Sequence, residues 1–143
     1  MKRTVVLIAG LIAFPSWADG DISPGMWEFT VNVQAEGLGG LAPKPGPIVN
    51  QRCITPEQAA NPEKALTEAG TKGQCTFSNQ RNTGIEFNFD VACTAPFPVQ
   101  GSGTMRYTAE AMEGDLDLAG DMQGMKFKTR SHINARRLGP CNA

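Results

Sequence analysis

The chain has 143 residues, with 13 basic and 14 acidic side chains, one histidine and four cysteines. The length fits one domain. The nearly balanced charge argues against general nucleic-acid binding, which needs a strongly basic face, and against an electrostatic hold on anionic lipid.

The first 18 residues have the pattern of a secretory signal peptide. Lys2 and Arg3 precede an apolar run over residues 4–14, which is too short to span a bilayer as a helix. Small residues at positions 16 and 18 fit those that signal peptidase reads. We therefore expect cleavage after about Ala18, a periplasmic or secreted location, one domain over residues 19–143, and no transmembrane segment after cleavage.

The N-terminal part of this domain predicts two strands and one helix. Residues 23–36 alternate, with Trp27 and Phe29 on one face and Glu28 and Thr30 on the other, as in a half-buried strand. A loop rich in Gly and Pro follows over 37–47, and a short strand is expected over 48–54. The segment 55–70 is the helical stretch, since Thr55 with Gln58 forms a capping box and Pro56 suits the first turn.

The rest of the chain predicts five strands, over 74–80, 84–93, 99–109, 112–120 and 124–135. A turn at 82–84 would set Phe77 opposite Phe89. A turn at Gly120–Asp121 would set Leu116 opposite Met125 on the inner face, and acids opposite lysines on the outer face. The outward charges are then a cross-strand ladder.

These elements indicate a mostly β fold. We expect about seven antiparallel strands, largely a meander, that form a curved sheet or incomplete barrel with one short helical excursion, because a single apolar face must be covered. The alternative is a two-sheet β-sandwich.

The four cysteines, Cys53, Cys75, Cys93 and Cys141, indicate two disulfides in an exported chain. Their gaps of 22, 18 and 48 residues do not fit a zinc site, which favours close pairs. The predicted hairpin register makes Cys75 and Cys93 diagonal neighbours, slightly too far apart for an easy bridge. The spacing therefore favours Cys53–Cys75 and Cys93–Cys141, although three strands would separate the second pair.

Enzymatic chemistry is not indicated. The only histidine, His132, falls on the outer face of its strand, and we find no nucleophile with an oriented base. No cofactor is predicted. Four methionines, Met105, Met112, Met122 and Met125, lie close in sequence and could suit Cu(I), but methionine is also an ordinary core residue.

Two kinds of binding remain open. In the first, a barrel interior carries a small apolar ligand, with room left by Gly101 and Gly103. Its lining residues would be the inward aromatics, which could equally be core: Trp27, Phe87, Phe89, Tyr107 and Phe127. In the second, an unknown envelope protein binds at loops, and the candidates are the loop over 37–47 and the turn at 95–98 with Phe97. Arg136 and Arg137 are a further candidate, because their guanidinium groups suit anions.

Several motifs resemble an exported bacterial family, domain-of-unknown-function family 3617. The most specific are Pro24-Gly25-x-Trp27-Glu28, Cys53-x-Thr55-Pro56-Glu57 and Leu138-Gly139-Pro140-Cys141, and the resemblance extends from Pro24 to Cys141. It implies a small periplasmic or secreted domain with four cysteines, and it implies no activity. The sequence thus predicts a non-enzymatic, disulfide-stabilised binding or structural module of the cell envelope.

Overall fold

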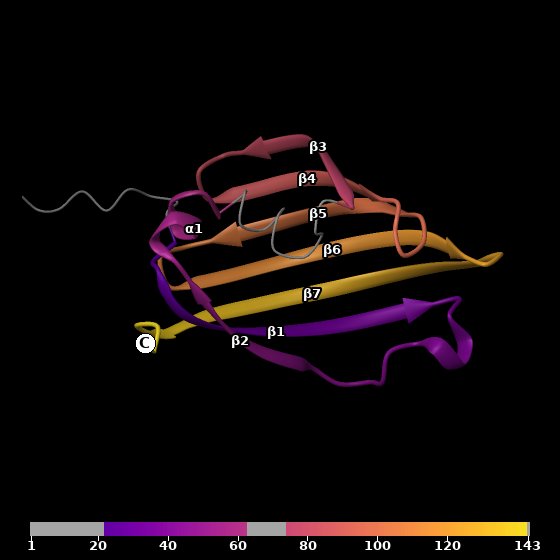
Figure 1. Ribbon diagram of the computed structural model, residues 1–143, viewed down its shortest axis with the longest axis horizontal. Helices are drawn as coiled ribbons and strands as arrows, with labels where there is room; N and C mark the ends of the chain where they lie inside the picture. Colours follow the sequence, from indigo (N-terminus) through magenta and orange to yellow (C-terminus); the bar gives the residue numbers. More distant parts are fainter. Residues whose placement is uncertain (1–21, 63–73, 143) are drawn as a thin grey trace, which may run out of the picture.

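The computed structural model describes residues 22–62 and 74–142, which form one seven-stranded antiparallel sheet. The strands lie in the order β2-β1-β7-β6-β5-β4-β3, so β3 to β7 form a meander and β1 and β2 extend it beyond β7 (Figure 1). The bounds are β1 Gly25–Glu36, β2 Ile48–Ile54, β3 Cys75–Asn82, β4 Glu86–Cys93, β5 Val99–Tyr107, β6 Ala111–Met122 and β7 Met125–Gly139.

Two free edges, β2 and β3, leave this sheet unclosed. The expected mostly β class with seven antiparallel strands is confirmed, and the alternative two-sheet sandwich is wrong. The connection from β1 to β2 contains the short helix η1 (Gly39–Leu41), and α1 (Pro56–Ala60) follows β2. The predicted signal peptide and its cleavage site, and residues 63–70 of the predicted helix, lie outside the described residues.

The capping box of α1 is confirmed. Gln58 N donates to Thr55 Oγ1 at 3.3 Å, and Thr55 N donates to Gln58 Oε1 at 3.0 Å. Pro56 occupies the first turn, where its missing N–H costs no hydrogen bond. These interactions start the helix directly after β2, at the end of the sheet where the chain also ends (Figure 1).

The core lies at this end of the sheet. Trp27 of β1 and Phe87 of β4 are fully buried in it, and Ala59 of α1 is 4% exposed. The cluster also contains Ile54 of the edge strand β2, so side chains from opposite parts of the sheet converge around α1. The buried members are Ile22, Trp27, Ile54, Ala59, Phe87, Met105, Tyr107, Met112 and Ala135.

The hairpin of β6 and β7 keeps the predicted faces but not the predicted register. The turn lies at Gln123–Gly124, where both residues have positive φ, and Leu116 pairs with Ser131 instead of Met125. The shift is six residues, an even number, so inward and outward residues are unchanged. Gly120 lies within β6 opposite Phe127, and it leaves room for the Phe127 ring, since a Cβ there would lie 2.6 Å from it.

The β3–β4 register also differs from the prediction, and this decides one disulfide. Ile85 falls inside the predicted strand 84–93 and was expected to face inward, but it stays in the loop before β4 with 61% exposure. Next to the turn Asn82 pairs with Phe87, three residues from the predicted register, and the bulge between Ser78 and Arg81 reduces this difference to two, so Phe77 pairs with Val91 instead of Phe89. Cys75 therefore pairs directly with Cys93, with a Cα–Cα distance of 4.0 Å, and the two are disulfide-bonded.

The second disulfide joins Cys53 to Cys141. Met26 of β1 pairs with Cys53 on one side and with Gly139 on the other. The tail after Gly139 crosses the start of β1, and the Cα atoms of the two cysteines are 5.5 Å apart. The favoured connectivity, Cys53–Cys75 with Cys93–Cys141, is therefore wrong, because it was derived from a hairpin register that does not form.

Candidate functional site

The predicted ligand-lining aromatics are packed against one another and against the sheet. Phe87 stacks on Phe89 with ring centroids 5.2 Å apart, and the Tyr107 hydroxyl accepts a hydrogen bond from Asn82. The ring of Phe89 fills the space over Gly103, where a Cβ would collide with it. This glycine therefore accommodates a core aromatic. The five aromatics are Trp27, Phe87, Phe89, Tyr107 and Phe127, and all but the half-buried Phe89 are at most 6% exposed.

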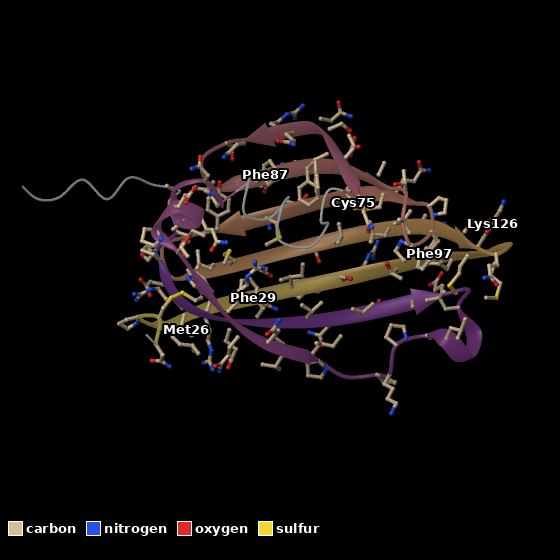
Figure 2. All side chains as sticks on the ribbon, viewed as in Figure 1. Met26, Phe29, Cys75, Phe87, Phe97 and Lys126 are labelled. Carbon is tan, nitrogen blue, oxygen red and sulfur yellow. A yellow bond between two sulfur atoms is a disulfide. The ribbon has the colours of Figure 1, made fainter. Side chains whose placement is uncertain are left out.

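The predicted partner-binding residues do not form one surface. Phe97 is half-buried and packs edge-on against Phe127, 5.5 Å away. Arg136 lies nine residues further along β7, about 30 Å from that contact at strand spacing. Figure 2 shows Phe97 near Lys126, at the opposite end of the sheet from Met26.

Both arginines are engaged within the chain. Arg136 Nη2 donates to Glu28 Oε1 at 2.9 Å, and Arg137 Nε donates to the Pro24 carbonyl at 2.8 Å. Hydrogen bonds from Gln51 and from Arg136 hold the pKa of Glu28 below its ordinary value of 4.5. The pair at 136–137 therefore fastens the end of β7 to the start of β1.

The four methionines form two separate pairs. Met105 and Met112 are buried in the core, whereas Met122 pairs with Met125 beside the β6–β7 turn. Ten residues of β6 separate Met112 from Met122, about 30 Å in a strand. The four thioethers cannot bind one copper ion together.

The outer face of the sheet carries the predicted charge ladder in its corrected register. Asp117 Oδ1 accepts from Arg130 Nε at 2.7 Å, and Glu86 Oε2 accepts from Arg106 Nε at 2.8 Å. Hydrogen bonds from Asn88 and from Arg106 lower the pKa of Glu86. Ion pairs join neighbouring strands across much of this face.

His132 belongs to the same ladder. Its Nδ1 lies 2.8 Å from Asp115 Oδ1, and its Nε2 lies 3.6 Å from Glu113 Oε1. Within the described residues, both ring nitrogens thus face carboxylates.

An open hollow of about 750 Å³ lies on the outer face, near the β6–β7 turn. Ala92 and Ala119 form its floor, because their short side chains lie between longer ones in one row across the sheet. Glu36 and Lys128 border it. The border carries both signs of charge, so it favours neither anions nor cations.

The strand β2 and the connection before it expose large apolar side chains to solvent. Ile48 and Val49 are 56% and 57% exposed, and Leu41 in the preceding connection is 63% exposed. The side chains of residues 48–53 are all exposed, and β1 is the only strand beside β2 in the sheet. We call residues 41–54 the β2 edge region. Sequence reasoning named the 37–47 loop as a candidate for partner binding but treated 48–54 only as a strand, although the adjacent Ile48 and Val49 cannot both face one core.

Within the described residues, no helix is long and apolar enough to cross a membrane. The same residues contain no group of three or more His, Cys, Asp or Glu side chains placed to hold a metal ion.

Comparison with known proteins places the chain in a family. Neither the curated proteins nor the solved structures contain a match. The sequence profile of one family, described as "Protein of unknown function (DUF3617)", matches residues 22–141. This match covers most of the chain, so the protein belongs to the DUF3617 family.

Proposed function

We propose that the protein is a non-enzymatic module of the cell envelope that binds another protein through its β2 edge region. The observation that carries this proposal is the exposure of apolar side chains on both faces of the edge strand β2 and in the connection before it. Leu41, Ile48 and Val49 are each more than half exposed, beside a strand edge whose backbone groups are available for pairing. An exposed apolar strand at the edge of a sheet is a template for pairing with another chain.

Export is supported by the two disulfides, which persist in oxidising compartments, and by the signal-peptide pattern of residues 1–18. A non-enzymatic role is supported by His132, whose ring nitrogens both face carboxylates. A structural role for the outer face of the sheet is supported by its ion pairs, in which charged side chains of neighbouring strands neutralise each other.

Site-specific photocrosslinking in the producing cell tests this proposal. A benzophenone amino acid replaces Leu41, Val49 or, as a control, Ile85, which is equally exposed at 61% but lies alone in the β3–β4 loop. We expect one adduct of the same mass from positions 41 and 49 and none from position 85. Equal labelling at all three positions, or no adduct at 41 and 49, would contradict the proposal.

A small apolar ligand is the second candidate. It is favoured by the inner face beyond the core, where apolar side chains remain half-buried: Phe29, Val31, Val33, Phe89, Leu116, Leu118 and Ile133. Native mass spectrometry of the protein from its own compartment tests it. A co-purifying lipid would support the carrier, and bound copper would support a metal role. If only the mass of the protein without a ligand were found, protein binding would remain the better-supported function.

A further inference from the structure

Building on the proposed function, we infer that β2 binds an extended, acidic segment of its partner by adding it to the sheet as an eighth strand. The segment pairs antiparallel with Ile48–Ile54 and places a carboxylate opposite Arg52. The argument rests on the edge's unpaired backbone, on the contrast with the other edge, and on charge.

The backbone of β2 offers a template of seven residues. In an edge strand, alternate residues direct their N–H and C=O groups away from the sheet, and an added strand can satisfy them. The register with β1 runs without interruption from Gly25–Ile54 to Val31–Ile48. Pro47 precedes this stretch and α1 begins after Thr55, so the docked segment has a defined length.

The opposite edge lacks these properties. In β3 a bulge between Ser78 and Arg81 interrupts the register, and Asn79 has a φ of 50°. Bulges of this kind prevent an edge from pairing with another strand. From Ser78 onward its side chains are polar and exposed. Of the two edges, β2 is therefore the one suited to strand addition.

Charge selects the occupant. The sequence from Gly37 to Pro56 contains Lys44 and Arg52 and no acidic residue, although the whole chain has a net charge of −1. Arg52 is exposed, and no ion pair joins it to another described residue. A partner strand with a carboxylate opposite Arg52 gains a cross-strand pair.

The same charge disfavours a second copy of this chain. If two β2 strands paired about Gln51, Arg52 of one copy would pair with Asn50 of the other. The two Arg52 side chains would then be diagonal neighbours on one face, where like charges repel. An inward-facing charge at an edge is a known barrier to self-association, and here it still admits an acidic strand.

Two synthetic peptides test the inference. The acidic probe is acetyl-Val-Thr-Glu-Thr-Thr-Val-Val-amide, which in antiparallel pairing sets Glu opposite Arg52 and its last two valines opposite Val49 and Ile48. The basic probe has Lys in place of Glu. NMR titration measures affinity, and amide hydrogen exchange locates the contact. We expect the acidic probe to bind with a dissociation constant of about 1 mM or lower. It should slow amide hydrogen exchange within Ile48–Ile54.

A charge exchange separates strand addition from other modes of binding. Arg52→Glu should lower the affinity for the acidic probe and raise the affinity for the basic probe, each by about tenfold. The matched control is Arg81→Glu on the β3 edge, which should change neither affinity. The inference would be overturned if both probes bound equally well, or if the acidic probe slowed amide exchange only outside β2. It would also be overturned if the acidic probe did not bind at a concentration of about 1 mM. If crosslinks at positions 41 and 49 are nevertheless found, strand addition is wrong and the proposed function stands.

Discussion

The two disulfides should contribute unequally to stability, because they close loops of very different length. Cys53–Cys141 spans 88 residues and Cys75–Cys93 spans 18. In the chain-entropy model, a cross-link destabilises the unfolded state more as the closed loop lengthens. The expected contributions are about 4.6 kcal/mol for the long loop and about 3.2 kcal/mol for the short one. Removing Cys53–Cys141 should therefore cost about 1.4 kcal/mol more.

The measurement uses two paired variants, Cys53→Ala with Cys141→Ala, and Cys75→Ala with Cys93→Ala. In protein that begins at Asp19, Trp27 is the single tryptophan, and it is fully buried, so its fluorescence reports urea unfolding. The free energy of unfolding, extrapolated to water, should fall further in the first variant. An equal or larger loss in the second variant would refute the entropic reasoning.

Peptide mapping tests the connectivity itself. Trypsin places the four cysteines in separate peptides, over 53–64, 73–81, 82–106 and 138–143. Without reduction, the first should remain joined to the last, and the two middle peptides to each other. A 53–64 peptide joined to 73–81 would show that the connectivity described above is wrong.

Three further outcomes are expected. Phe87→Ala should lower the free energy of unfolding by about 3–5 kcal/mol, because Phe87 is fully buried in the core; Ile85→Ala, at an exposed apolar residue of the preceding loop, should change it by less than about 0.5 kcal/mol. Gly103→Ala should destabilise the protein in the same urea assay, because the new Cβ would collide with the Phe89 ring; unchanged stability would show that the ring moves freely. The pKa of Glu28 is lowered in the folded protein, so its carboxylate stabilises the fold fully at pH values above the ordinary pKa of 4.5. This stabilisation is lost as the pH falls through the folded-state pKa. The stability gap between wild type and Glu28→Gln, followed by urea unfolding from pH 7 to 3, should therefore narrow with acid, and a constant gap would contradict this.

Local patterns in the sequence were sufficient for the seven strands and for the inner faces of the strands that build the core. The alternation that places Trp27 and Phe87 inward depends only on neighbouring residues, since successive side chains in a strand point to opposite faces. The start of α1 was equally predictable, because the Thr55–Gln58 capping box acts within four residues. The charge ladder also followed from alternation, with partners that changed when the register did.

The candidate site was not predictable in the same way. The residues first considered for binding, such as Phe97 and Arg136, are held by contacts within the chain and lie at opposite ends of the sheet. The exposure of Ile48 and Val49 arises because β2 is the last strand of the sheet. Which strand lies at an edge depends on pairing between distant segments, and periodicity within one segment carries no information about it.

The sequence by itself determined a chain of alternating strands, with apolar residues on one face and charges on the other, because that pattern is local. Only the tertiary structure decided the register, the disulfide partners and the free edge. The β3–β4 register differs from the predicted one by two residues at Cys75, and the β6–β7 register differs by six. The first of these registers sets Cys75 opposite Cys93, and the pairing of β1 with both β2 and β7 brings Cys53 close to Cys141.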